Sequence, residues 1–204
     1  MKFSLTILLA SAAASVVLAA QYCDAATRVC YYEVVASGAA YRIAIPDVTA
    51  APFDILLQIA APKTVGWAGV AWGGQMALNP LTLGWANGNR AVVSSRWAAA
   101  HSMPGAYTGA AYTVLKGSAS NGTHWSLTTL CRGCSQWNAS GTMKSVDPVA
   151  TAPVNLAYAL SRSVPSQPAN NASRIAIHNA KGTLALDMAA AKTSKFDEYV
   201  RSLT

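Results

Sequence analysis

The sequence predicts an all-β protein, an antiparallel β-sandwich with a short C-terminal helix. Short β-rich runs recur along the chain, separated by Gly, Pro, Asn and Ser. Charged residues make up only 11% of the chain, which favours a compact β protein over a disordered one. Only the last dozen residues place apolar side chains three and four positions apart, as an amphipathic helix does. Regularly spaced short strands with turn signals between them are typical of a sandwich.

The first twenty residues are predicted to be a targeting segment. Lys2 supplies a positive start, an apolar run follows, and small residues around Ala19 form a cleavage site. The apolar run is too short for a comfortable membrane span, and no later stretch approaches one. We therefore expect a signal peptide in residues 1–20 and a single secreted, extracellular domain in residues 21–204, with no membrane anchor.

The charge pattern argues against nucleic-acid binding. Without Lys2 the chain keeps 14 of its 15 basic residues against 8 acidic ones. The basic residues are spread singly rather than in runs, which is typical of a solvated surface. A mild basic excess steers a protein toward an acidic partner, and this steering weakens as salt rises. We expect a monomer with no nucleic-acid partner.

Four cysteines in a secreted chain indicate two disulfides, for which three pairings exist. Cys23 and Cys30 lie close in sequence, as do Cys131 and Cys134, so local pairing is the simplest arrangement. The Cys131-Arg-Gly-Cys134 run is also compatible with a redox dithiol or half of a zinc site. No second CxxC exists, and an oxidising compartment favours a closed bridge.

Three sequons, each in a stretch rich in turn formers, predict N-glycosylation. Their acceptor residues are Asn121, Asn138 and Asn171. We expect all three in solvent-facing loops.

Individual strands are predicted from period-two alternation and from the turn residues between the runs. The Asn87-Gly88 pair is the strongest hairpin signal, and residues 36–39 predict a second hairpin. The expected strands cover residues 31–35, 41–45, 52–60, 66–72, 82–85, 90–97, 111–115, 124–131, 156–160, 173–177 and 183–186, and the helix covers residues 192–203.

Two stretches present candidate metal ligands. Val65-Gly-Trp-Ala-Gly-Val-Ala-Trp-Gly-Gly-Gln-Met76 predicts a buried strand that runs into a paired-glycine turn and presents the thioether of Met76. Ile175-Ala-Ile-His178 predicts an apolar strand, followed by a turn at residues 179–182 that projects the imidazole beyond the sheet edge. Methionine and histidine form an axial pair suited to a haem iron. Ser135 rather than histidine follows Cys134, so a haem would be held without thioether links.

Other residues compete for this role. A single methionine is more often core filler than a ligand, and a single histidine is more often a satisfied polar residue. The remaining candidates are His101, His124, Met103, Met143 and Met188. We expect His124, which follows a sequon, to face solvent or a sheet surface. Met76 stands out because the glycines before it remove side-chain bulk beside a cofactor plane.

Several blocks in a fixed order carry a family resemblance. They are Gly73-Gly-Gln-Met76, Ala86-Asn-Gly-Asn89, Ser94-Ser-Arg-Trp97, Ala106-Tyr-Thr-Gly109, Thr123-His-Trp125 and Cys131-Arg-Gly-Cys-Ser-Gln-Trp-Asn138. From about residue 30 to its end the chain resembles the cytochrome domain of fungal cellobiose dehydrogenases. The resemblance implies an immunoglobulin-like, DOMON-like sandwich that binds one haem b, with Met76 and His178 as the axial ligands.

The resemblance also implies a role in single-electron transfer. Family members accept electrons from a flavin-dependent dehydrogenase and pass them to copper-dependent lytic polysaccharide monooxygenases or to small acceptors such as ferric iron. With both axial positions filled, we expect no substrate-turnover site in this chain. No flavin-binding domain is present, so the donor is expected to be a separate molecule unless the chain is a fragment of a larger flavocytochrome.

Two positions depart from the family pattern. His101, in the run Ala98-Ala-Ala-His-Ser-Met-Pro104, stands where relatives commonly have a tyrosine near the haem propionates. A histidine there would pair with a propionate and make the potential depend on pH. An exposed loop residue is the equally open alternative. Lys181 replaces an aromatic residue that often follows the ligand histidine.

A carbohydrate-binding sandwich without catalytic activity is the alternative function. Its stacking platforms would come from Trp67, Trp72, Trp85, Trp97, Trp125 and Trp137. Most of these lie in strand patterns, which favours core positions. A hydrolase finds no support, because the acidic residues are scattered and no GxSxG, Walker or HExxH motif occurs.

Overall fold

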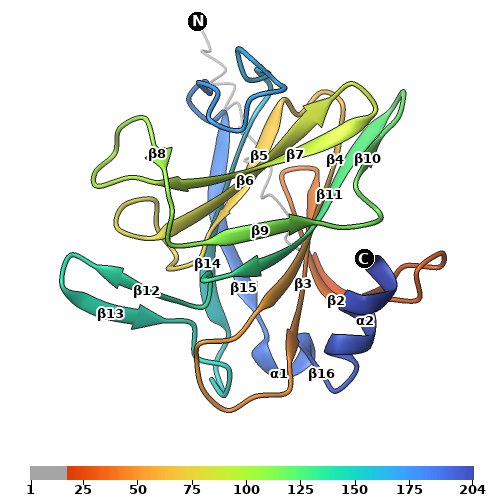
Figure 1. The fold of residues 1–204 in the computed structure, drawn as a ribbon, viewed down its shortest axis with the longest axis vertical. Coiled ribbons are helices and arrows are strands. Elements are labelled where there is room, and N and C mark those ends of the chain that lie inside the picture. The colour runs from red at the N-terminus through yellow and green to blue at the C-terminus, as the bar shows by residue number, and fades with distance from the viewer. Residues whose placement is uncertain (1–17) are drawn as a thin grey trace, which may run out of the picture.

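Two stacked β-sheets form the body of the protein (Figure 1). The computed structural model describes residues 18–204. The expected signal peptide, residues 1–20, lies outside this range except for its last three residues, which begin the first strand. Within residues 18–204, no helix is both long and apolar enough to cross a membrane.

The first sheet has eight strands, in the order β1-β2-β3-β4-β11-β10, with β9 paired to β11 and β16 to β3. All its pairings are antiparallel except the parallel β16–β3 contact. The strands are β1 (Leu18–Cys23), β2 (Cys30–Ala36), β3 (Ala39–Pro46), β4 (Ile55–Pro62), β9 (Ala111–Val114), β10 (Ala119–Ser120), β11 (His124–Arg132) and β16 (Lys192–Thr193).

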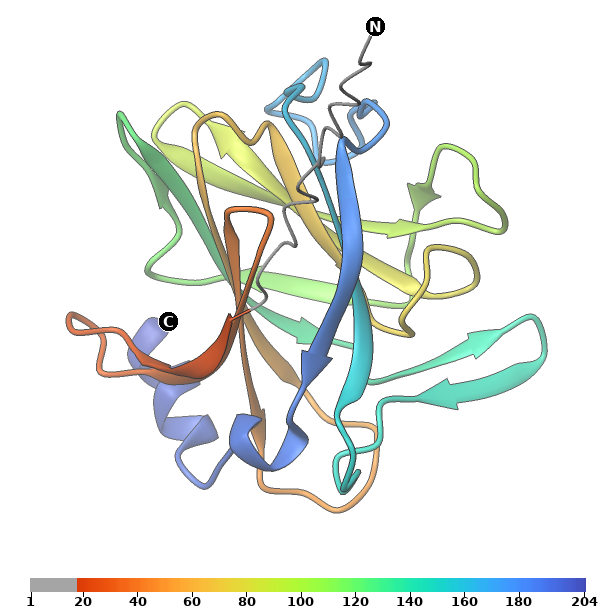
Figure 2. The same ribbon diagram turned by 180° about the vertical axis from the view of Figure 1, so that it is seen from behind.

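The second sheet has six antiparallel strands in the order β15-β14-β5-β6-β7-β8 (Figure 2). They are β5 (Trp67–Ala71), β6 (Pro80–Asn87), β7 (Arg90–Trp97), β8 (Gly105–Ala106), β14 (Val154–Ser161) and β15 (Ala180–Leu186). A separate hairpin, β12 (Gln136–Ala139) with β13 (Thr142–Ser145), extends from the body.

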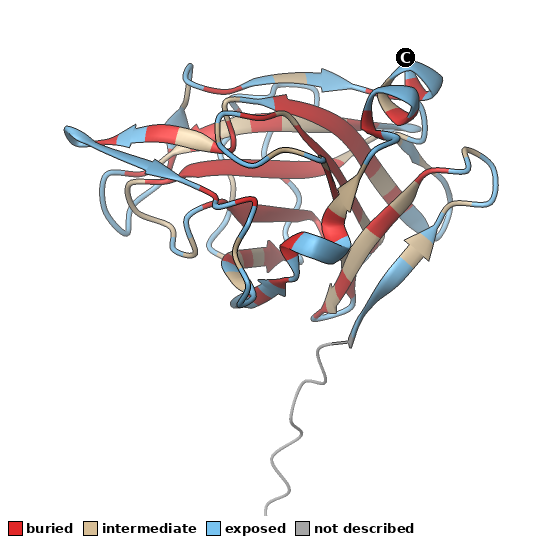
Figure 3. Cartoon of the chain, turned by 90° about the horizontal axis from the view of Figure 1, so that it is seen from below, coloured by how far each residue is buried: buried red, intermediate tan, exposed pale blue. Residues whose placement is uncertain are grey.

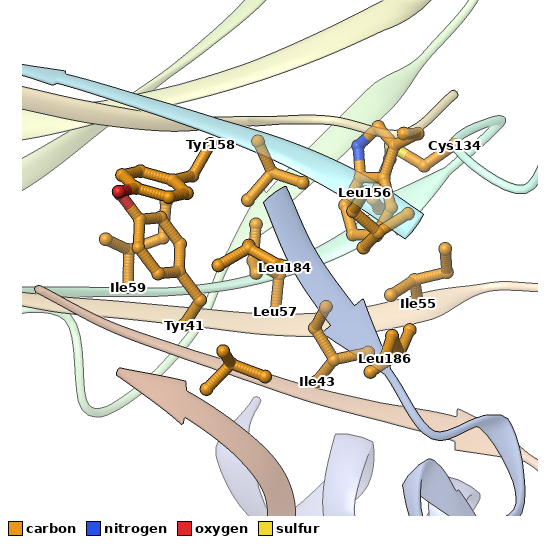
Figure 4. Packing of buried hydrophobic residues seen from close by; sticks show 14 of the residues in the cluster. Tyr41, Ile43, Ile55, Leu57, Ile59, Cys134, Leu156, Tyr158, Leu184 and Leu186 are labelled. Atoms are coloured by element: carbon orange, nitrogen blue, oxygen red, sulfur yellow. A yellow bond between two sulfur atoms is a disulfide. The ribbon is translucent and has the colours of Figure 1, made fainter. Parts of the chain in front are cut away.

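The core lies between the two sheets, where buried strand faces meet (Figure 3). On β4, Ile55, Leu57 and Ile59 alternate toward the second sheet, as the period-two pattern predicts. They meet Leu156 of β14 and Leu184 of β15, and all five side chains are essentially fully buried (Figure 4). Burial of large aliphatic side chains in this layer is the main force that holds the sheets together.

The two outer faces of the sandwich differ. Helices α1 (Met188–Ala191) and α2 (Phe196–Leu203) contact β2 and β3 of the first sheet. On α2, Phe196, Tyr199 and Leu203 lie on one side and pack in a cluster with Leu56 and Leu130. The helix thus covers part of the outer face of the first sheet, while the corresponding face of the second sheet lines a cavity, described below.

Several sequence-based expectations are confirmed. Both predicted hairpins form, and the first turns through Ser37 and Gly38, with φ angles of 50° and 81°. Positive φ at both central residues is the backbone that a two-residue hairpin favours. The structure joins Cys23 to Cys30 and Cys131 to Cys134, as local pairing predicts.

Other expectations are wrong. Residues 173–177 do not form a strand, and residues 180–182 of the expected turn are instead the start of β15. The C-terminal helix begins at Phe196 rather than residue 192, since Lys192 and Thr193 pair with β3. The hairpin of β12 and β13 was not expected.

Side-chain hydrogen bonds explain why residues 173–177 are no strand. The indole Nε1 of Trp67 donates to the carbonyl of Ala176 at 3.2 Å. Arg96 Nη2 donates to the carbonyl of Ser173 at 2.6 Å. These carbonyls therefore bond to side chains of the second sheet instead of to a neighbouring strand.

The three sequon asparagines are all exposed. Asn121 and Asn171 lie in loops, as expected, but Asn138 lies on β12. Glycosylation of the three sites stays a prediction.

Candidate cofactor-binding site

A cavity of about 930 Å³ lies against the outer face of the second sheet. Met76 and His178 both line it, and so does His101. The three residues come from segments that are far apart in the chain, and the fold brings them to one site. A cavity of this size is in the range of those that bind organic cofactors.

The floor of the cavity is made of small residues. Ala68 and Val70 of β5, and Trp72 just after it, point into the core, so that Gly69 and Ala71 face the opposite side. On β14, Ala157 and Ala159 continue this surface, and Leu81 and Leu83 of β6 border it. A Cβ on Gly69 would collide with Leu83 and lie 2.7 Å from the carbonyl oxygen of Thr82. The result is a flat, apolar floor.

Met76 lies at one end of this floor, in the loop between β5 and β6. Its half-buried side chain packs with Ala71, Leu81 and Ala98. The loop needs glycine at position 74, where φ is +79° and a Cβ would meet the carbonyl oxygen of Asn155 at 2.7 Å. The paired-glycine turn predicted from the sequence is therefore present.

His178 follows the irregular segment that borders the other end of the floor. Ile175 packs with Trp67 and Leu83, and the Trp67 indole holds the carbonyl of Ala176. Directly after His178, the backbone N–H of Asn179 donates to the carbonyl of Leu160 at 2.8 Å. His178 itself is half-buried on the cavity wall.

The mouth of the cavity carries basic side chains. Arg174, Lys181 and His101 line it and are exposed, whereas no aspartate or glutamate contributes to the lining among residues 18–204. The ion pairs of the described chain involve other cations, namely Arg42, Arg132 and Lys192. The mouth is thus suited to an anionic group.

A buried arginine ties two parts of this rim together. The Arg96 side chain on β7 is 3% exposed. It donates to the carbonyls of Pro104 (3.1 Å), Asn171 (2.9 Å) and Ser173 (2.6 Å), and to the hydroxyl of Ser94. Burial lowers the pKa of its guanidinium. Arg96 therefore connects the loop that carries His101 to the segment that leads to His178.

The remaining sequence candidates are dispersed. His124 is exposed on β11 of the first sheet, as expected, and Met143 is exposed on the β13 hairpin strand. Met188, the first residue of α1, is buried. Met103, by contrast, lines the cavity and is 44% exposed, although no sequence pattern distinguishes it from the other methionines.

The sequence matches the family of the cytochrome domain of cellobiose dehydrogenase over residues 22–198. Among curated proteins, the pyrroloquinoline quinone-dependent pyranose dehydrogenase of Coprinopsis cinerea is 29% identical over 154 residues, 76% of this chain. The chain spans only 21% of that relative's length.

Two solved structures share the fold. The cytochrome b domain of the Coprinopsis cinerea pyranose dehydrogenase superposes with a TM-score of 0.80 and 26% identity, covering 90% of this chain and 95% of that one. The cytochrome domain of Myriococcum thermophilum cellobiose dehydrogenase superposes with a TM-score of 0.78 and 20% identity, covering 91% and 96%. The β-sandwich with a short C-terminal helix, predicted from the sequence, is confirmed. Because the family match spans most of the described chain, this protein belongs to the cytochrome domain family of cellobiose dehydrogenase.

Proposed function

We propose that this chain is a secreted b-type cytochrome that binds one haem b in the cavity of the second sheet and transfers single electrons. The observation that carries the proposal is that Met76 and His178, the two candidate ligands, line the same cavity. Family membership supports a haem electron-transfer role in general terms. The ligands, the partners and the extracellular location are part of the proposal.

The residues of the cavity fit a haem. An apolar macrocycle placed between Met76 and His178 would rest against the apolar floor formed by Gly69, Ala71, Ala157 and Ala159. Thioether sulfur and imidazole nitrogen are established axial donors for haem iron. When bound, the haem would supply a one-electron iron couple. Ordinary packing contacts with the floor would hold its hydrophobic rim.

Met76 is the better thioether candidate of the two methionines at the cavity. It is half-buried and packs with Ala71 and Leu81, whereas Met103 lies on an exposed rim loop. A thioether ligand favours ferrous iron and raises the reduction potential compared with two histidines. Met76 and His178 together would fill both axial positions, which leaves the chain without a substrate-turnover site of its own.

The basic mouth would receive the anionic propionates. Arg174 and Lys181 are the cations there, and His101 lines the same mouth. Positive charge near the site favours the reduced state, because reduction adds an electron.

The proposed electron donor is a sugar-oxidising dehydrogenase. Relatives of this chain include a pyrroloquinoline quinone-dependent pyranose dehydrogenase and the cytochrome domain of a cellobiose dehydrogenase. A flavin or a quinone cofactor in the donor is therefore compatible with the family. A copper-dependent lytic polysaccharide monooxygenase or ferric iron is the proposed acceptor.

The carbohydrate-binding alternative has less support. Its aromatic platforms would have to be exposed, yet five of the six tryptophans are at most 4% exposed. The sixth, Trp97, is half-buried and stacks on Tyr107, with ring centroids 5.0 Å apart. The tryptophans thus fill the protein interior, as their strand positions predict.

The first test is the visible spectrum of the purified protein with haem b, before and after reduction. Sharp reduced α and β bands are expected for low-spin iron with two axial ligands. Met76→Ala should shift the spectrum and potential, and His178→Ala should lower haem affinity at least about tenfold, or about 1.4 kcal/mol. Met143→Ala serves as the matched control on the exposed hairpin. Unchanged spectra in both ligand variants would reject the assignment.

His101 can be tested through the pH dependence of the potential. Protonated His101 adds positive charge at the mouth, so the potential should fall as pH rises through the range where histidine titrates. His101→Ala should flatten this dependence, while His124→Ala, an exposed histidine on the first sheet, should leave it unchanged. If the reduction potential changes with pH equally in the wild type and in His101→Ala, His101 does not influence the potential.

Arg96 should stabilise the rim. Arg96→Met leaves the carbonyls of Pro104 and Ser173 without this donor, and leaves the Asn171 carbonyl with only the Ser94 hydroxyl, at a cost of roughly 2–4 kcal/mol in the free energy of unfolding. Limited proteolysis should then cut the rim loops faster. Arg90→Met, at an exposed position of the same strand, is the control and should be nearly neutral. Equal stability of the two variants would contradict this role.

Reduction by a separate dehydrogenase should be a bimolecular process. Its observed rate should rise with dehydrogenase concentration and then saturate, and it should drop about tenfold between low and high salt if the basic mouth steers docking. Lys181→Gln should slow it, whereas Lys144→Gln on the hairpin should not. If the rate of reduction depends neither on salt nor on Lys181, the dehydrogenase does not dock at the mouth of the cavity.

A further inference from the structure

The loop that carries Met76 also contains a buried asparagine, Asn79. Asn79 is 0% exposed and directly precedes β6. Its side-chain Nδ2 donates to the carbonyl of Gln75 at 3.0 Å and to the carbonyl of Ala77 at 2.8 Å. These are the two residues on either side of Met76, so one amide group fixes the backbone on both sides of the candidate ligand.

We propose that Asn79 is a positioning residue that holds the Met76 thioether in its ligating position. The inference rests on the proposed function, in which Met76 is an axial ligand. Three further features of the loop support this role: the orientation of the Asn79 amide, the glycine packed against it and the hydrogen bonds that hold Leu78.

The orientation of the amide is determined by its surroundings. Two carbonyl oxygens face it, so the nitrogen must point toward them, and only a donor can satisfy both. Its Oδ1 is buried and has no hydrogen-bond partner among residues 18–204. A buried polar atom without a partner is costly, and it is retained here together with the two bonds that fix the loop.

Gly73 allows this arrangement. A Cβ at position 73 would overlap with Asn79 Oδ1 and lie 2.8 Å from the ring of Trp137. The φ of Gly73 is outside the left-handed region, so a side chain is excluded by space and not by backbone conformation. The first glycine of the pair is thus required by the contact with Asn79, whereas Gly74 is required by its positive φ.

A second brace holds the other side of the loop. Trp137 Nε1 donates to the carbonyl of Leu78 at 3.1 Å, and the N–H of Leu78 donates to the carbonyl of Ala98 at 2.8 Å. Leu78 has a φ of 58°, which is uncommon for a residue with a branched side chain. The loop is therefore held from β12 and from the rim loop as well as from within.

Such bracing has a functional consequence for a methionine ligand. Methionine has three rotatable side-chain bonds and adapts easily to other contacts, so it does not hold its own position. The thioether can bind iron only in molecules whose loop backbone places Met76 within reach of it. When a smaller fraction of molecules has this loop conformation, the apparent affinity of the thioether for iron falls by the same factor. Met103 on the rim offers a competing thioether once Met76 is free to move.

The test uses the haem-loaded full chain and three variants. Asn79→Leu removes both hydrogen bonds without adding charge, and Asn79→Asp faces the two carbonyls with acceptors only. Gly73→Ala keeps Asn79 but displaces its amide. Two readouts report the thioether directly: the weak far-red charge-transfer band of ferric iron bound to methionine, and the rate at which ferrous iron binds carbon monoxide.

All three variants should lose most of the charge-transfer band and bind carbon monoxide about tenfold faster or more than wild type. Thr129→Val is the matched control, because it removes one buried hydrogen bond, from Thr129 Oγ1 to the carbonyl of Thr113, within the first sheet. It should lower stability without changing either readout. Adding Met103→Leu to Asn79→Leu shows whether residual thioether ligation comes from Met103.

The outcomes separate this inference from the function on which it rests. If Met76→Ala abolishes the band but folded Gly73→Ala and Asn79→Leu proteins keep it, with carbon monoxide binding as slow as in wild type, Asn79 does not position Met76. If Met76→Ala leaves the wild-type spectrum unchanged, the ligand assignment itself is overturned. If an Asn79 variant does not fold, Gly73→Ala alone decides, because it leaves the asparagine in place.

Discussion

The site depends on which residues of β5 face the cavity. Val70 and, just after the strand, Trp72 point into the core, whereas the small residues Gly69 and Ala71 face the cavity next to Trp67. Because side chains alternate strictly along a strand, a shift of one residue would turn Val70 and Trp72 toward the cavity and Gly69 and Ala71 toward the core. The burial of apolar side chains in the core, which fixes the register of β5, therefore also keeps the cavity open. The register of β14, with Ala157 and Ala159 on the same side, extends this surface.

The two segments that carry the candidate ligands share a second feature. Neither belongs to the hydrogen-bond ladder of a sheet, and each is held by side chains that donate to its carbonyls. Asn79 does this on both sides of Met76, while Trp67 and Arg96 do it along the segment before His178. Segments held in this way have their conformation before any cofactor binds. A preformed site needs little rearrangement when the cofactor binds or changes its oxidation state.

Much of this fold can be read from the sequence, because alternation and Asn-Gly turns are local signals. The run Ile175-Ala-Ile-His178 also alternates, and this alternation predicts a strand that does not form. Its actual conformation depends on Arg96, far away in the chain, whose hydrogen bonds no local pattern reveals. Asn79 was missed for a related reason: an asparagine between a loop and a strand looks like an ordinary turn residue until its burial is known. The sequence reveals the ligand candidates because glycine pairs and apolar runs surround them. The side chains that hold their backbone in place, such as Asn79 and Arg96, have no such local pattern.

The mouth of the cavity determines how a partner can reach the site. Ile177, next to His178, is 85% exposed, and Met103 lies on the opposite rim loop at 44%. Around them stand the basic side chains of Arg174 and Lys181. Helix α2 is on the first sheet, so it does not obstruct this side. A small apolar centre with a cationic rim favours a fast, salt-sensitive encounter and a weakly held complex. These are the properties that a protein needs if it must receive an electron from one partner and release it to another.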